Sequence, residues 1–213
     1  MPVRKIPISS RSLTGRHAYG RGKDAVGFES SLERDFISLM RFDINVTDIE
    51  EQPVRIAFQD SAGNHRHYTP DFLVHRRSGT SMLAEIKPAK FVTADLDDKF
   101  NAARNFARRR GWMFEVWTEQ QIRIPRLENA KFLVPYQQAE PPAGARDRLL
   151  TALGETGRTT VTRLLDATCR QEDDRAETLF ALWHLVATGT VAAGMDDPLT
   201  PASEIHLNEG NQR

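Results

Sequence analysis

Two acidic residues and a lysine stand out in this sequence, because their types and spacing suit the binding of a metal ion. Asp71 follows Pro70 at the start of an apolar run, and Glu85 and Lys87 lie two residues apart in the next run. Carboxylate oxygens are the hard ligands that Mg²⁺ prefers, and a nearby ammonium can orient an attacking water molecule or stabilise charge on a phosphate. The alternative is an ordinary cross-strand ion pair on a solvated sheet face.

A β-hairpin is predicted for the segment that contains these residues. Residues 68–74 and 82–87 are rich in β-branched and apolar side chains, and residues 76–81 include a turn-forming serine and glycine. Side chains two apart on a strand share a face, so the glutamate and the lysine of the second strand project together. Because Asp71 starts the first strand, it can lie alongside them at one end of the hairpin.

An amphipathic helix is predicted before the hairpin, because apolar residues recur at three- and four-residue spacing between residues 28 and 40. Ser30 can cap this helix, and Glu33 stands where a capping box requires its second partner. Glu33 also lies beside the apolar stripe, where it could point toward the hairpin as a third metal ligand. Glu29, one turn earlier, is the competing candidate.

The other elements of this domain complete an α/β fold with a mixed sheet flanked by helices. The pattern predicts a turn at residues 45–48, a strand at residues 52–58, a helix at residues 95–110 and a strand at residues 112–117. A helix between two strands is typical of a crossover to a parallel neighbour. The predicted order is helix, three strands, helix, strand, and residues 121–136 are expected to close the domain.

The formal net charge is zero, but the charge is unevenly distributed. Residues 145–213 contain seven basic and eleven acidic side chains, whereas residues 1–144 contain twenty-two basic and eighteen acidic ones. The N-terminal arm and the outer side of the helix at residues 95–110 are basic, and each suits contact with DNA phosphates or forms a solvated surface. The candidate DNA-binding residues are Arg4, Lys5, Arg11, Arg16, Arg21, Lys23, Arg104 and Arg108.

The cysteine content and the hydropathy indicate a cellular compartment. Cys169 is the only cysteine, which excludes an intramolecular disulfide and fits a reducing environment. The sequence has no apolar run long enough to cross a membrane and no apolar stretch typical of a secretory signal. We therefore expect a cytoplasmic protein that is not bound to a membrane.

The C-terminal region is predicted to be a winged-helix domain. Residues 137–145 contain Pro and Gly and are expected to be a linker, and three helical patterns followed by a two-stranded hairpin occupy residues 146–213. In such a domain the start of the third helix contacts base edges. Here that start is acidic, with Glu172, Asp173, Asp174 and Glu177, which repel phosphate. The sequence therefore favours docking on a protein over reading of DNA.

Four motifs, in this order, resemble those of the TnsA family, the endonuclease subunits of heteromeric Tn-seven-type transposons. The likeness continues into the C-terminal region and covers nearly the whole chain. The topology is also similar to that of the restriction-endonuclease-like nucleases. The motifs are residues 28–36, 51–54, 68–72 and 85–88, with a further likeness at residues 129–133.

The resemblance implies a role for each residue of the site. Asp71 would bridge metal ions, Glu85 and the Ile86 carbonyl would complete the site, and Lys87 would position the attacking water. Some members of the family have Gln where this chain has Glu85, so this position accepts a weaker ligand. The implied cofactor is one or two Mg²⁺ ions, for which Mn²⁺ would substitute. The implied reaction is metal-assisted hydrolysis of a DNA phosphodiester.

The resemblance also bears on the helix carboxylate and on two residues near the site. Glu33 matches the helix carboxylate of the family better than Glu29 does, because it follows the Ser-Leu pair. Gln52 lies in a family motif and is expected either near the site or bonded to backbone where the strand starts. His67 is expected on the strand surface, from which it could touch DNA.

The implied partners are those of a cut-and-paste transposition system. Family members cut the strand that bears the 5′ end of the element in double-stranded DNA, and a DDE-type transposase cuts and joins the 3′ ends. The C-terminal domain would engage an AAA+ ATPase regulator. The resulting domains are a basic arm at residues 1–27, an endonuclease domain at residues 28–136, the linker and residues 146–213. The alternatives are a stand-alone restriction or repair endonuclease and a non-catalytic DNA-binding adaptor.

Overall fold

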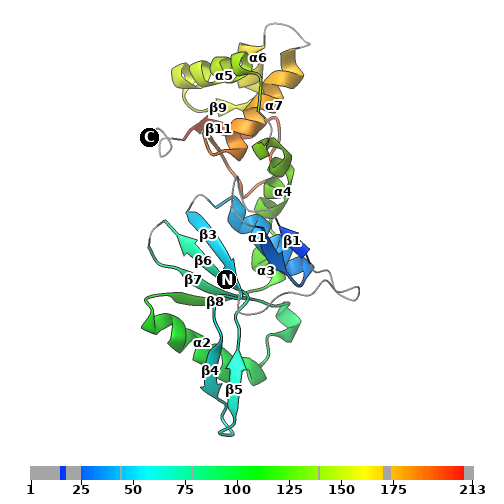
Figure 1. Cartoon of the computed structure of the whole chain (residues 1–213). Coiled ribbons are helices and arrows are strands. Elements are labelled where there is room, and N and C mark those ends of the chain that lie inside the picture. The colour runs from blue at the N-terminus through cyan, green and yellow to red at the C-terminus, as the bar shows by residue number, and fades with distance from the viewer. Residues whose placement is uncertain are drawn as a thin grey trace. The chain divides into compact units, whose positions relative to one another are not determined.

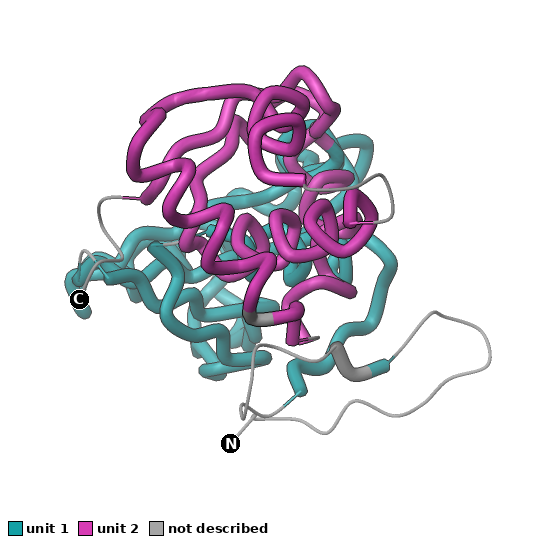
Figure 2. Tube along the Cα trace, turned by 90° about the horizontal axis from the view of Figure 1, so that it is seen from above, with its two compact units in different colours: residues 1–123 teal, residues 124–213 magenta. Residues whose placement is uncertain are grey.

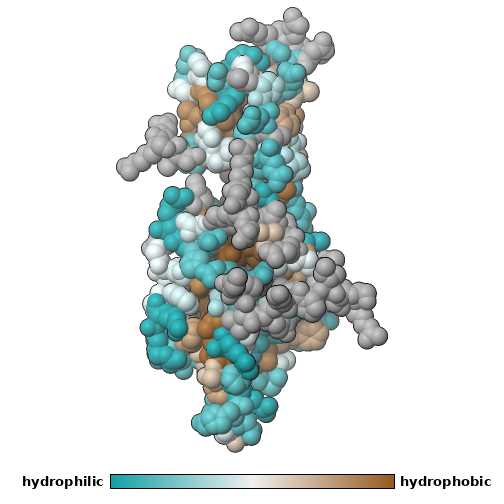
Figure 3. Space-filling view, viewed as in Figure 1, coloured by the Kyte–Doolittle hydropathy of each residue, from teal (hydrophilic) through white to brown (hydrophobic). Residues whose placement is uncertain are grey.

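The computed structural model of the protein describes residues 15–17, 25–43, 45–77, 79–138, 140–169 and 174–208. The chain divides into two compact units, residues 1–123 and residues 124–213 (Figure 2). Hydrophilic side chains predominate on the face drawn in Figure 3, with apolar ones between them. Within the described ranges, no helix combines the length and the apolar character that crossing a membrane requires.

A four-stranded mixed sheet forms the centre of the first unit, in the order β3-β6-β7-β8. β6 pairs antiparallel with β3 and with β7, and β7 pairs parallel with β8. The predicted hairpin and the predicted parallel crossover are therefore both present, and Gly79 provides the positive φ of 90° that the hairpin turn contains. The strands are β3 (Val46–Glu51), β6 (Phe72–Arg76), β7 (Met82–Ile86) and β8 (Met113–Trp117).

Each face of this sheet is covered by one helix (Figure 1). Helix α1 (Ser31–Arg41) begins at the predicted cap, Ser30, and its buried Phe36 lies 5.5 Å from the ring of Phe72 and 5.3 Å from that of Trp117. Helix α2 (Asp97–Arg109) buries Ala103, Phe106 and Ala107 against Leu73 and Leu83. Because successive strand residues point to opposite faces, Phe72 faces α1 and Leu73 faces α2.

A second hairpin departs from the predicted strands. β4 (Ile56–Gln59) and β5 (His65–Tyr68) pair only with each other and pack against α2 (Figure 1). The strand predicted at residues 52–58 begins four residues later, because Gln52 has a left-handed φ of 44° that interrupts the extended chain. The turn predicted at residues 45–48 is wrong, since β3 starts at Val46 and has a register shift before Asp48.

Short elements complete the first unit. β1 (Gly15–His17) pairs antiparallel with β2 (Val26–Phe28), so part of the predicted basic arm is a strand. Two turns of 3₁₀ helix, η1 (Ala89–Phe91) and η2 (Ala94–Leu96), lead from β7 to α2. Helix α3 (Glu119–Ile122) ends the unit, with Thr118 and Gln121 forming a capping box.

The second unit consists of four helices and a small antiparallel sheet in the order β10-β11-β9. Its three last helices and the pair β10–β11 follow the predicted order, and β9 is an additional short strand. The strands are β9 (Thr159–Thr160), β10 (Val191–Ala193) and β11 (Glu204–Leu207). The helices are α4 (Pro125–Gln138), α5 (Ala143–Thr156), α6 (Val161–Thr168) and α7 (Asp174–Ala187).

The boundary between the units differs from the predicted linker at residues 137–145. Helix α4 was expected to close the first domain, but its buried Asn129 donates two hydrogen bonds to the carbonyls of Met195 and Asp197, at 2.9 and 2.7 Å. Its amide oxygen also accepts the N–H of Leu199 at 3.0 Å. These bonds hold the connection between β10 and β11 on α4, and the boundary therefore lies after Arg123.

The contact of Phe36 with two aromatic rings makes it the most sensitive position of the α1 face. We expect Phe36→Ala to lower the free energy of unfolding by about 3–5 kcal/mol, because it leaves a cavity in a fully buried site. Urea unfolding followed by circular dichroism measures this change. Phe91→Ala is the matched control, since Phe91 is 55% exposed, and an equal loss in both variants would contradict the packing described.

Candidate active site

The register of the β6–β7 hairpin determines where the two central carboxylates lie. Phe72 pairs with Ala84 and Leu73 with Leu83, so the next pair outward is Asp71 opposite Glu85. The backbone N–H of Ile86 donates a hydrogen bond to Asp71 Oδ2 at 2.7 Å, which closes this end of the hairpin. Both carboxylates therefore lie together, as the sequence predicted.

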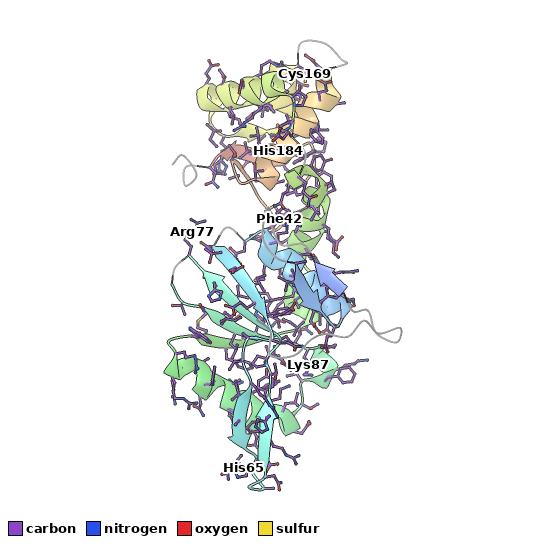
Figure 4. The ribbon with its side chains drawn as sticks, in the orientation of Figure 1. Phe42, His65, Arg77, Lys87, Cys169 and His184 are labelled. Atoms are coloured by element: carbon purple, nitrogen blue, oxygen red, sulfur yellow. The ribbon has the colours of Figure 1, made fainter. Side chains whose placement is uncertain are left out.

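Lys87 follows Glu85 on the same side of the strand. Its Nζ lies 3.7 Å from Glu85 Oε1, and its backbone N–H donates to the carbonyl of Trp117 on β8 at 2.9 Å. Figure 4 labels this lysine at the end of the sheet. The predicted pairing of the glutamate and the lysine is confirmed.

Two further residues hold the Glu85 side chain, which is only 4% exposed. The hydroxyl of Tyr68 donates to Oε2 at 2.7 Å, and Lys99 Nζ lies 2.7 Å from Oε1. The sequence did not predict either contact. Tyr68 lies in the motif of residues 68–72 without a role of its own, and Lys99 lies in a helix twelve residues beyond Lys87, where no short motif indicates a contact.

Glu33 binds at the start of α1 as the capping box predicted, but its side chain accepts the N–H of Glu29 instead of that of Ser30. Its Oε1 accepts the hydroxyl of Ser30 at 2.9 Å and its Oε2 accepts the backbone N–H of Glu29 at 2.7 Å, while the Ser30 hydroxyl accepts the N–H of Glu33. Both carboxylate oxygens of Glu33 thus accept hydrogen bonds from residues at the start of α1. Glu29 Oε1 accepts the amide of Gln52 at 3.2 Å, and which of the two glutamates is the helix carboxylate stays a prediction.

Gln52 joins α1 to the strand that carries Asp71. Its backbone N–H donates to the Asp71 carbonyl at 2.8 Å, in the left-handed conformation that is rare for residues other than glycine. Its amide nitrogen binds Glu29, and its buried Oε1 has no hydrogen-bond partner among the described residues. Gln52 therefore lies next to Asp71, as one of its expected roles required, but its side chain binds Glu29 and not backbone, and no strand starts at Pro53.

Burial raises the pKa of two carboxyl groups at the site, those of Asp71 and Glu33. Burial, and then the nearby charges of Glu85 and Glu33, raise the pKa of Asp71 well above its ordinary value, although the Ile86 N–H and Lys99 oppose this shift. Burial is also the main cause that raises the pKa of Glu33. Burial and the charge of Glu85 raise the pKa of Tyr68, so its hydroxyl remains a proton donor to Glu85. The site therefore concentrates negative charge away from water.

The other predicted site residues lie elsewhere. His67 is exposed on β5, on the face opposite to Tyr68, and its neighbour His65 lies at the outer end of the hairpin (Figure 4). Arg104 and Arg108 are exposed on α2 and donate to Asn101 and Asn105, at 3.0 and 3.1 Å. Arg16 lies in β1, whereas Arg4, Lys5, Arg11, Arg21 and Lys23 lie outside the described residues.

The donors of the site suit a hard cation through two carboxylates rather than three. Within the described part of the chain, no group of three or more His, Cys, Asp and Glu side chains is arranged to hold a metal ion. Both oxygens of Glu33 accept hydrogen bonds at the start of α1, and those of Glu85 bind Tyr68 and Lys99. Asp71 and Glu85 still fit Mg²⁺, which usually binds one or two carboxylates together with water and phosphate oxygens.

The mixed sheet with its flanking helices and its buried carboxylate–lysine cluster fits a nuclease fold. Residues 43–119 match the family described as TnsA-like endonuclease N terminal, and residues 121–195 match that described as TnsA endonuclease C terminal. The chain therefore belongs to the TnsA family of transposase endonuclease subunits. A search of curated proteins gave no match.

The matched ranges agree with the structure. They meet within a few residues of the boundary between the two compact units. The first range contains Asp71, Glu85, Lys87 and Lys99, whereas Glu33 lies outside it. The carboxylates of the hairpin are thus inside the region that defines the family.

The raised pKa of Asp71 predicts a gain in stability when its charge is removed. A carboxyl whose pKa is raised by folding favours the protonated native state, so stability falls as the pH rises through the pKa of the folded protein. We expect Asp71→Asn to raise the free energy of unfolding at pH 7 in the presence of a chelator. The gain should shrink as the pH falls toward the ordinary pKa of aspartate, about 3.9.

Asp35→Asn is the control for this comparison. Asp35 is also a buried aspartate, 4% exposed, but its Oδ2 pairs with Arg123 Nε at 3.2 Å, so its loss should destabilise the protein by about 1 kcal/mol. Urea unfolding of both variants between pH 4 and pH 8 measures these changes. A loss of stability at pH 7 in Asp71→Asn would show that Asp71 is an ordinary structural partner.

Proposed function

We propose that this protein hydrolyses a DNA phosphodiester at the ends of a transposon, on the strand that bears the 5′ end of the element. The cluster of Asp71, Glu85 and Lys87 at one end of the mixed sheet supports this proposal most directly. The other strand would be cut and joined by a partner transposase of the DDE type. Membership of the TnsA family supports the proposal that two proteins cut the two DNA strands.

In this proposal, each residue of the cluster has one task. Asp71 and Glu85, with the carbonyl of Ile86, hold one or two Mg²⁺ or Mn²⁺ ions. A bound ion would supply neutralisation of the negative charge that develops on the phosphate. Lys87 orients the attacking water and stabilises the phosphate oxygens, because its ammonium stands beside the carboxylates. Glu33 adds negative charge from the start of α1 without being a ligand.

The outer side of α2 is the surface that best suits the DNA backbone. Arg104 and Arg108 lie one turn apart and are exposed, and each is fixed by an asparagine of the same helix. Arginine forks match phosphate geometry, and α2 also provides Lys99 to the site. A duplex that reaches the carboxylates along α2 would meet these arginines.

For the second unit we propose a winged-helix fold that docks on an AAA+ regulator. The order α5, β9, α6, α7, β10, β11 and the three-stranded antiparallel sheet support this fold. The start of α7 supports docking on protein rather than on DNA. Glu177 is exposed there and can present acid to a partner, whereas Asp174 is paired with Arg148 at 3.6 Å.

Loss of Lys87 or of the Asp71 charge should abolish strand cleavage. We expect Lys87→Ala and Asp71→Asn to lower the rate of nicking at least about a hundredfold in the presence of the partner transposase, Mg²⁺ and a DNA fragment with one transposon end. The rate of appearance of the 5′-strand product on a denaturing gel measures this effect. Lys90→Ala is the control, because Lys90 is exposed on η1 and is not bonded to the carboxylates.

The same assay separates the alternative functions. Rapid cutting by the wild-type chain without any transposase would identify a stand-alone nuclease. Cutting at the wild-type rate by Asp71→Asn would show that the site is elsewhere. Absence of cutting by the wild-type chain under all conditions, together with DNA binding, would indicate a non-catalytic adaptor.

The α2 surface makes a separate prediction about DNA affinity. Replacement of Arg104 and Arg108 by Glu should weaken binding to duplex DNA and flatten its dependence on salt. Each lost phosphate contact reduces the slope of log K against log salt by about 0.9, so the double variant should lose up to about 2. Fluorescence anisotropy between 50 and 200 mM salt measures the slope. Arg158→Glu in the second unit is the control, and an equal change there would contradict the proposed surface.

A further inference from the structure

The closest charged contact of Glu85 is with Lys99 rather than with Lys87. Lys99 Nζ lies 2.7 Å from Glu85 Oε1, whereas Lys87 Nζ lies 3.7 Å from the same oxygen. The Lys99 ammonium also lies over the ring of Tyr68, 4.3 Å from its centroid, and the Tyr68 hydroxyl binds the other oxygen of Glu85. Lys99, Tyr68 and Glu85 therefore form a closed group of contacts.

This group contributes more to orientation than to the packing of α2. The helix already packs through Phe100, Ala103, Phe106 and Ala107, which are all buried. A buried ion pair adds little net stability, because the desolvation of both charges offsets their attraction. The ion pair instead fixes the orientation of Glu85 next to Asp71, because Lys99 binds one carboxylate oxygen of Glu85 and Tyr68 binds the other.

A divalent cation on Glu85 Oε1 would lie beside the Lys99 ammonium and be repelled by it, whereas the neutral phenol of Tyr68 on Oε2 repels no cation. Tyr68 is 6% exposed and belongs to the core between the sheet and α2, so its ring has little freedom to move. Lys99 has a flexible four-carbon side chain that is 24% exposed. Lys99 is therefore the group that can withdraw, and Oε1 is the oxygen that becomes available.

We propose that Lys99 is a second functional lysine of the site, a positioning residue that holds Glu85 Oε1 and yields this oxygen to a divalent cation. This proposal rests on the proposed function, since it requires Asp71 and Glu85 to be the ligands. Tyr68 keeps Oε2 throughout and prevents rotation of the carboxylate. After withdrawal, the Lys99 ammonium remains at the mouth of the site, close to the phosphate of a bound strand.

Binding of Mn²⁺ to the full-length protein tests this exchange without any need for cleavage. In calorimetric titrations with Mn²⁺ alone, we expect Lys99→Met to bind about tenfold more tightly than the wild type, a factor that corresponds to about 1.4 kcal/mol. Lys99→Arg keeps the charge and the contact and should bind as the wild type does. Lys90→Met, which removes an exposed lysine near the same helix, controls for the change in net charge.

The crystal structure of the wild-type protein soaked in Mn²⁺ gives a second measurement that does not depend on the folding of a variant. We expect Mn²⁺ on Glu85 Oε1 and Asp71, with Lys99 Nζ more than 4 Å from that oxygen. Mn²⁺ bound while Lys99 keeps its present contact would overturn the exchange, as would equal or weaker binding by Lys99→Met.

Asp71→Asn separates this inference from the proposed function. If it abolishes Mn²⁺ binding while Lys99→Met has no effect, the metal site stands and the role of Lys99 is refuted. If Asp71→Asn binds Mn²⁺ as well as the wild type, or if neither protein binds it, the proposed ligands are wrong and the role of Lys99 is refuted with them.

Discussion

The burial of two carboxylates side by side is the constraint on which this site depends. Asp71 and Glu85 lie opposite each other because of the register of one hairpin, and burial and mutual repulsion act against their charges. Such an arrangement is maintained only if the surrounding structure supplies compensation. Four groups supply it here. They are the Tyr68 hydroxyl on β5, the Ile86 N–H on β7, the Lys87 ammonium directly after β7 and the Lys99 ammonium on α2. Separate segments of the first unit therefore stabilise the negative charge of the site.

The hairpin and its carboxylates could be predicted because their signals are local. The strands of the hairpin are indicated by their apolar and β-branched residues, by a turn that contains glycine and by the proline–aspartate pair at the start of the first strand. The two-residue spacing of Glu85 and Lys87 places both side chains on the same side of the second strand. The cap of α1 was equally local, since Ser30 and Glu33 are three residues apart. The hypothesis that Glu33 is also a ligand stays a prediction, and each of its oxygens accepts one hydrogen bond at the start of α1.

The contacts that could not be predicted join segments that are distant in the sequence. Lys99 meets Glu85 only because α2 returns across the sheet to bring its first turns to the end of β7. The strand expected at residues 52–58 was interrupted at Gln52, whose unusual backbone is stabilised by bonds to Asp71 and Glu29. The boundary between the compact units lies before α4, where Asn129 binds a loop some seventy residues later. The spacing of apolar residues in the sequence does not predict such long-range polar contacts.

Tyr68 is the last residue of β5, and its hydroxyl donates a hydrogen bond to Glu85. The β4–β5 ribbon has no hydrogen-bonded strand neighbour in the described sheets other than its own partner, but Ile56 and Tyr68 fix its inner end in the core between the sheet and α2. The phenol that binds Glu85 is therefore positioned by side-chain packing and not by strand pairing with the mixed sheet. A substitution that alters the packing of this ribbon would reach the carboxylate through Tyr68 and leave the register of the β6–β7 hairpin unchanged.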